Sequence, residues 1–255
     1  IYNLSYGRGY ADGETLYNLQ WYLDPEGDLE AALLHGVTEL RMGKGAIYLW
    51  SSGNEFELHS NSDCGEYLSC VETLWDNYSS VPYIMSIGSI SANGLVSTYT
   101  TPGSSLWVSG IGGDSGLNYS FAISTADSDY APGLMTTDQS SCSRGYVGSN
   151  SGTIQPNHFD DALGVNTENL NCNYTSTFAG TSASTPTVSG VVALMLEANA
   201  DLTWRDVKHI LAVTADQVDA DRSYDHLGIN QYGWVTNKAG YQHHNWYGFG
   251  RVNAA

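Results

Sequence analysis

The residue best placed for chemistry is a serine at the expected start of an apolar helix. Ser182 lies in residues 178–186, FAGTSASTP, directly before a long apolar run. Glycine and small side chains permit a tight turn there, and Pro186 fits the first turn of a helix. Because a helix N-terminus favours negative charge, a serine there is either a nucleophile with a stabilised oxyanion or a helix cap. The residue type alone favours the cap.

A second polar cluster follows a buried strand. Residues 46–50, AIYLW, predict the strand, and Ser52, Gly53 and Asn54 come shortly after it. Ligands bind at the carboxyl ends of strands in open α/β sheets, and an asparagine amide at such a place can donate to a developing oxyanion. The alternative is an asparagine that serves a turn.

The N-terminal segment offers a place for an extended ligand. Residues 1–5 predict a short apolar strand. Ser5, Tyr6 and Gly7 lie at its end, where their backbone can pair with a peptide substrate.

Three stretches in which apolar residues recur at helical spacing must position these segments. The first begins at residues 24–26, DPE, and ends at the glycines of residues 43–45; the second ends near Asn199. The third begins at Thr203, where Asp206 completes a variant capping box. The expected buried faces are Leu29, Ala32, Leu33, Val37 and Leu40; Val188, Val191, Val192 and Met195; and Val207, Ile210, Leu211 and Val213.

Strands that alternate with these helices predict an α/β fold with a mostly parallel sheet. Further apolar runs lie at residues 81–87 and 106–108, and strands that are apolar on both faces are typical of a sheet covered by helices. The chain shows no repeat or clear linker. We therefore expect one domain over residues 1–255, with a candidate insertion loop at residues 143–171.

Composition excludes several classes of protein. The 255 residues include seven Trp and 18 Tyr and carry a net charge of −18, so the chain is globular and acidic. Nucleic acid is excluded as a partner because phosphate binding needs clustered Lys and Arg. No run approaches the ~18 apolar residues of a membrane-spanning helix.

The four cysteines indicate disulfides. They lack the short paired spacing of zinc ligands. Four cysteines allow three pairings, of which we favour the sequence-local ones, Cys64 with Cys70 and Cys142 with Cys172. Two disulfides would place the protein in an oxidising compartment; four free thiols in a cytosolic protein are the alternative.

Residues 5–7, 52–54 and 180–186, in this order, resemble three segments of the subtilisin-like serine proteases, peptidase family S8. The kexin and furin branch is indicated by LEAN, LTWRDV and YGFG at residues 196–199, 202–207 and 247–250. The resemblance implies a subtilisin-like α/β fold and a serine endopeptidase from a secreted, bacterial member. It also implies that Ser182 is the nucleophile and Asn54 the oxyanion donor, while Ser5, Tyr6, Gly7, Ser52 and Gly53 bind substrate.

The resemblance also implies that part of the catalytic machinery is missing. The family carries its catalytic Asp and His, and its first strands, upstream of the segment that matches Ile1. His35 with Gly36 looks like the histidine motif, but it lies on the first expected helix, downstream of the proper place. Because a serine needs an adjacent base, the fragment alone is expected to have little or no activity.

Kexin-like enzymes cleave after paired basic residues, which acidic groups recognise. Asp76 matches one such position, and Asp12 is near a second. Arg8 stands where a proline is usual, and the acidic pair near Asp12 is reduced to one residue. The resemblance therefore implies a basic residue before the scissile bond without a strict need for a second. Turn acids are the alternative for both aspartates.

Structural calcium is a further implication of the resemblance. Asp12 and Asp63 could contribute ligands, but residues 99–101, YTT, lack the acid that the branch places nearby, so the ligands cannot be assigned. His243 and His244 are interpreted as surface or packing residues, since adjacent histidines seldom share a metal.

The expected protein is secreted or periplasmic, acts on peptides with basic residues, and carries a β-sandwich domain after Ala255. Two alternatives remain. One is an inactive relative that binds peptides or a partner, and the other is an unrelated secreted carbohydrate-binding module.

Overall fold

The structure is a computed structural model. It describes residues 1–6, 27–56, 72–75, 78–114, 133–149, 159–160, 168–220, 225–226, 229–230 and 233–255. The helices are α2 (Asp28–Glu39), α3 (Gly145–Ser149), α4 (Thr181–Ala198), α5 (Trp204–Thr214) and the short 3-10 helix η1 (Thr73–Trp75). The strands are β1 (Tyr2–Leu4), β2 (Tyr48–Ser51), β3 (Ile84–Ile90), β4 (Leu106–Ile111), β5 (Leu134–Thr137), β6 (Tyr174–Phe178), β7 (Asp225–His226), β8 (Ile229–Asn230), β9 (Val235–Thr236) and β10 (Gln242–His243).

A parallel sheet of β1, β2, β3 and β4, in that order, forms the centre of the fold. Tyr2 pairs with Tyr48, and Tyr48 pairs with Ile84. The three two-stranded sheets elsewhere in the described chain are antiparallel. The α/β fold with a mostly parallel sheet is thus confirmed.

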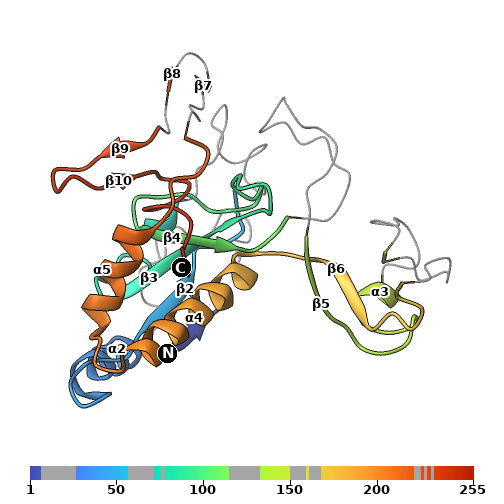
Figure 1. The fold of residues 1–255 in the computed structure, drawn as a ribbon, viewed down its shortest axis with the longest axis horizontal. Coiled ribbons are helices and arrows are strands. Elements are labelled where there is room, and N and C mark those ends of the chain that lie inside the picture. The colour runs from blue at the N-terminus through green and yellow to red at the C-terminus, as the bar shows by residue number, and fades with distance from the viewer. Residues whose placement is uncertain are drawn as a thin grey trace.

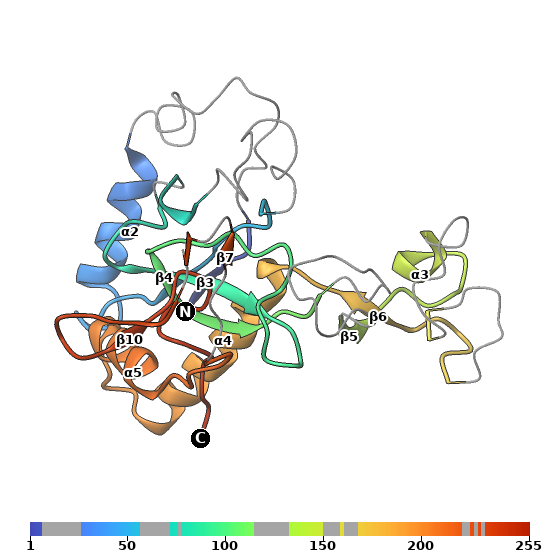
Figure 2. The same cartoon turned by 90° about the horizontal axis from the view of Figure 1, so that it is seen from above.

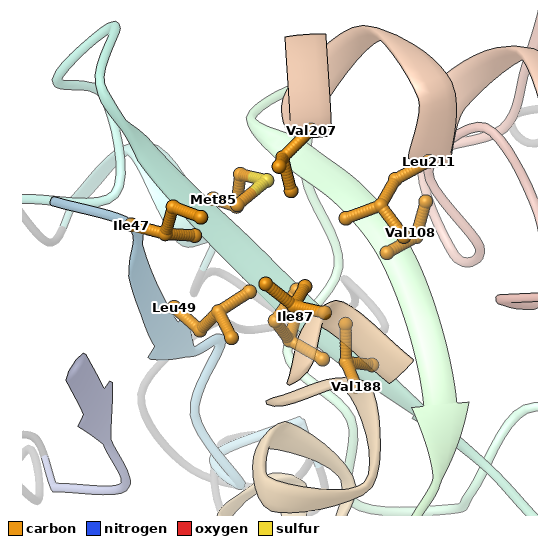
Figure 3. Close-up of a cluster of buried hydrophobic side chains, with 9 residues drawn as sticks. Ile47, Leu49, Met85, Ile87, Val108, Val188, Val207 and Leu211 are labelled. Atoms are coloured by element: carbon orange, nitrogen blue, oxygen red, sulfur yellow. The ribbon is translucent and has the colours of Figure 1, made fainter. Parts of the chain in front are cut away.

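Helices cover both faces of the parallel sheet, as Figure 2 shows. Alternate residues of the β2 segment point to opposite faces. Ile47 and Leu49 pack with α4 and α5, in the cluster drawn in Figure 3, whereas Tyr48 and Trp50 pack with α2. This burial on both faces explains why residues 46–50 form a continuous apolar run.

Helix α5 begins as its sequence predicts. The N–H of Asp206 donates to the Thr203 hydroxyl at 3.2 Å, and the Thr203 N–H donates to the Asp206 carboxylate at 2.8 Å. Val207 and Leu211 are buried on the expected face. Val213 is 44% exposed, so its predicted burial is wrong: it lies two residues after Leu211, on the other side of the helix.

A partly buried lysine connects α5 to the sheet. The Lys208 ammonium donates to the carbonyls of Pro82 at 2.6 Å and Ile84 at 3.3 Å, and it lies 4.1 Å from the centroid of the Trp107 ring. Burial lowers the pKa of Lys208 from 10.5 to about 8.

Helix α2 buries a narrower face than expected. Leu33 and Val37 are buried and Leu29 packs beside them, but Ala32 and Leu40 are exposed. Leu40 lies after the end of α2 at Glu39, because the chain turns there ahead of the glycines. The cap signal at residues 24–26 lies outside the described residues.

Strands β5 and β6, with α3 between them in the chain, lie to one side of the parallel sheet (Figure 1). A disulfide joins Cys142 to Cys172, as predicted. The suggested insertion, residues 143–171, runs between these two cysteines and contains α3. Its status as an insertion stays a prediction, as does the single domain. Cys64 and Cys70 lie outside the described residues.

Candidate active site

Three segments that are distant in the sequence meet at one end of the parallel sheet. Ser5 follows β1, and Ser52, Gly53 and Asn54 follow the adjacent strand β2. Helix α4 crosses this sheet and contributes its N-terminus, where Ser182 is the second residue (Figure 1). The first N–H groups of a helix have no partner within it, so this end favours a negatively charged group.

The side chain of Asn54 is fixed by the residue that precedes Ser182. Asn54 Oδ1 accepts hydrogen bonds from the Thr181 N–H at 2.8 Å and the Thr181 hydroxyl at 2.9 Å. Since a backbone N–H can only donate, the atom that faces it must be the carboxamide oxygen. The Nδ2 group therefore occupies the other branch, and a Cβ built at Gly180 would lie 3.7 Å from it.

Ser182 and Ser5 contact each other through two hydrogen bonds. The Ser182 hydroxyl donates to the Ser5 carbonyl at 3.3 Å, and the Ser5 hydroxyl donates to the Ser182 carbonyl at 3.0 Å. Pro186 explains the second bond: it has no N–H to donate to Ser182, four residues earlier, so that carbonyl is available. Pro186 is the sixth residue of α4, in its second turn, so its predicted place in the first turn is wrong.

The turn before α4 is held by a tyrosine. The Gly180 N–H donates to the Tyr99 hydroxyl at 2.7 Å. Gly180 has a φ of 124° and a ψ of 156°, a conformation that residues with a Cβ rarely adopt. Burial raises the pKa of Tyr99, so its hydroxyl stays neutral at physiological pH.

An aromatic stack lies beside the serine pair. The Tyr6 ring is 57% exposed, and its centroid lies 5.2 Å from that of Trp50, which stacks on Tyr78. The remaining predicted substrate and specificity residues, Gly7, Asp12 and Asp76, lie outside the described residues. Ser52 is buried and Gly53 is half-buried; both belong to the loop that carries Asn54.

The histidines whose side chains the structure describes make contacts elsewhere. His35 is exposed on α2, as expected, and the His209 ring packs on Tyr241. His243 contacts the Leu106 carbonyl, and burial lowers its pKa; His244 is buried and accepts from the Trp246 N–H. The two adjacent histidines therefore are packing residues.

The Asn54 loop is supported by residues that the sequence does not predict. The Thr181 hydroxyl accepts the Gly53 N–H at 3.2 Å as well as donating to Asn54. The Glu55 carboxylate accepts from the Thr101 hydroxyl at 2.9 Å, so an acid lies beside residues 99–101 although that segment has none. No local pattern reveals such contacts.

The described residues contain no group of three or more His, Cys, Asp or Glu side chains suited to a metal. Asp12 and Asp63 lie outside these residues. In the part of the chain that the structure describes, no helix is long and apolar enough to cross a bilayer.

The chain is similar to known proteins in sequence and in fold. Proprotein convertase subtilisin/kexin type 7 of Homo sapiens is 29% identical over 248 residues, which covers 94% of this chain and 24% of that protein. An extracellular serine protease of Aeromonas sobria is 26% identical over 273 residues, with 99% of this chain and 39% of that protein covered. The crystal structure of a serine protease of Aeromonas sobria matches with a TM-score of 0.73 and 26% identity, over 99% of this chain and 41% of that chain.

These matches remove the alternative of an unrelated carbohydrate-binding module. The chain covers less than half the length of each of these relatives. The subtilase model of peptidase family S8 matches residues 1–250, the span that brings Ser5, Asn54 and Ser182 together. The chain therefore belongs to the subtilase family.

Proposed function

We propose that this chain is part of a serine endopeptidase that hydrolyses peptide bonds by acyl transfer. Ser182 attacks the peptide carbonyl, a histidine outside this chain takes its proton, and Asn54 Nδ2 donates to the tetrahedral oxyanion. The C–N bond then breaks as the histidine returns the proton to the leaving amine, and water releases the acyl group from Ser182. The observation that carries the proposal is the anchoring of Asn54 Oδ1 by Thr181, which leaves Nδ2 beside the turn that presents the serine.

Labelling with a fluorophosphonate probe tests this function in the full-length protein. We expect the probe to label Ser182 and the label to be lost in Ser182→Ala. Ser189→Ala is the matched control, because Ser189 lies on the same helix, two turns further on, and should leave labelling intact. A full-length protein that folds but takes no label at Ser182 would be an inactive, peptide-binding relative.

We also propose that the 255-residue chain alone has little or no activity. In the described part of the chain the Ser182 hydroxyl donates to the Ser5 carbonyl, which is too weak a base to activate it. Turnover of a peptide substrate by this chain at the rate of the full-length protein would contradict the proposal.

The substrate class is proposed to be peptides with a basic residue before the scissile bond. The net charge of −18 supports this, since an acidic surface attracts cationic peptides. Asp76 is the proposed specificity residue, and Asp12 is a second, weaker candidate for this role.

Secretion and bound calcium are proposed as well. The Cys142–Cys172 disulfide supports an oxidising compartment. Calcium is proposed on the strength of the resemblance, with Asp12 and Asp63 as candidate ligands and no assigned ligand set. Titration of the metal-free full-length protein with Ca²⁺ should raise its melting temperature; an unchanged temperature would contradict calcium binding.

A further inference from the structure

We propose that Tyr99 is a positioning residue of this site: its hydroxyl holds the turn that presents Ser182, while its backbone holds the loop that carries Asn54. The proposal rests on the proposed endopeptidase function. Tyr99 touches neither Ser182 nor Asn54 in any contact described above, so its effect on the reaction is indirect.

The Tyr99 hydroxyl lies among groups that fix its hydrogen bonds. The carbonyls of Gly113 at 2.7 Å and Gly112 at 3.1 Å can only accept, so the phenolic proton points to them. A lone pair of the oxygen then accepts the Gly180 N–H at 2.7 Å, and the Ser89 hydroxyl lies 3.0 Å from the same oxygen. The orientation of the hydroxyl is therefore determined by its surroundings.

The backbone of the same segment pairs with the Asn54 loop. The Phe56 N–H donates to the Tyr99 carbonyl at 3.4 Å, and the Thr101 N–H donates to the Gly53 carbonyl at 3.1 Å. These two bonds flank Asn54 on both sides along the chain. Residues 99–101 thus hold the oxyanion loop with their backbone and the nucleophile turn with one side chain.

The turn needs this support because of its backbone conformation. Glycine has more conformational freedom than any other residue, and Gly180 adopts a φ of 124° immediately before α4. A shift of this peptide would move Thr181 and with it the two donors on Asn54 Oδ1. A misplacement of about 1 Å at a catalytic group can lower a rate about 100-fold.

Tyr99→Phe in the full-length enzyme tests the inference. We expect kcat to fall by about 10-fold to 100-fold, while KM changes by less than about 2-fold. The variant should weaken contacts made in the transition state and leave the binding of the ground-state substrate intact. In hydrogen exchange, the amide of Gly180 should exchange faster in the variant.

Tyr247→Phe is the matched control. Tyr247 is buried; its hydroxyl accepts the Val96 N–H at 3.1 Å and donates to Asp219 at 2.7 Å, and neither contact involves the site. Its kcat should match that of the wild type. An equal fall in kcat in both variants, or an unchanged kcat in Tyr99→Phe, would overturn the inference.

Two further outcomes keep the test decisive. If Tyr99→Phe does not fold, hydrogen exchange of the wild-type protein tests the inference instead. Rapid exchange of the Gly180 amide would show that the Tyr99 hydroxyl does not hold this N–H group. If Ser182 takes no label in a folded wild type, both the endopeptidase function and the inference fail. Labelling with an unchanged Tyr99→Phe kcat refutes the inference alone.

Discussion

Two substitutions at Asn54 separate its proposed catalytic part from its structural part. Asn54→Ala removes the amide and also leaves the Thr181 N–H and hydroxyl without their acceptor. Asn54→Asp keeps an oxygen at 2.8 Å and 2.9 Å from these donors and replaces only Nδ2 by a second oxygen. The added negative charge lies at the N-terminus of α4, where the helix dipole favours it.

The expected magnitudes differ between the two readouts. Loss of one oxyanion donor costs roughly 10²–10³ in kcat, about 3–4 kcal/mol, and both variants should show at least this loss. Thr181 is fully buried, so its unpaired groups in Asn54→Ala should lower the free energy of unfolding by about 1–3 kcal/mol. Asn54→Asp should unfold at nearly the wild-type denaturant concentration.

The assay combines steady-state kinetics on a peptide substrate with denaturant unfolding of the full-length variants. An Asn54→Asp enzyme within about 10-fold of wild-type kcat would refute the oxyanion role. A loss that appears in KM and not in kcat would assign Asn54 to substrate binding instead.

Asp76→Asn should weaken cleavage after Arg or Lys more than after apolar residues; unchanged ratios of kcat/KM would remove Asp76 from the specificity pocket. Replacing Cys142 and Cys172 by alanine opens a loop with a sequence separation of 30, so the free energy of unfolding should fall by about 3–4 kcal/mol; an unchanged denaturation midpoint would contradict this. Lys208 binds its proton more weakly when folded, so stability relative to Lys208→Met should rise by about 3 kcal/mol as pH increases from about 8 to 10.5; parallel pH profiles would show that burial does not perturb its pKa.

Much of the fold was predictable because short, local sequence patterns determine it. The capping box of Thr203 and Asp206 depends on four consecutive residues, and the structure contains both of its hydrogen bonds. The apolar run before Ser51 predicts β2, since burial on both faces leaves no polar alternation. Side-chain burial at helix ends was less predictable: Leu40 follows the last helical residue, and its exposure depends on where the chain turns.

The residues of the candidate site likewise fall into those that local patterns predict and those that they do not. Ser182 lies at the start of a helix and Asn54 follows a strand, and the sequence shows both elements clearly, so their meeting at one sheet end was predictable. The part played by Tyr99 was not predictable, because its hydroxyl bonds to the N–H of Gly180, which lies 81 residues away along the chain. The contact of Glu55 was not predictable for a related reason: its partner Thr101 comes from a different loop. Single hydrogen bonds between distant loops leave no periodic trace in a sequence.

The order of the parallel sheet has a consequence for folding kinetics. Every pairing in it joins residues from separate parts of the chain, such as Tyr2 with Tyr48 and Tyr48 with Ile84. Long segments must therefore be closed into loops before any of these pairings is gained, and such topologies fold in milliseconds to seconds or more slowly. We expect helices α4 and α5 to gain secondary structure early after dilution from denaturant, while β1, the strand that precedes Ser5, joins last and limits the rate at which Ser5 and Ser182 come into contact.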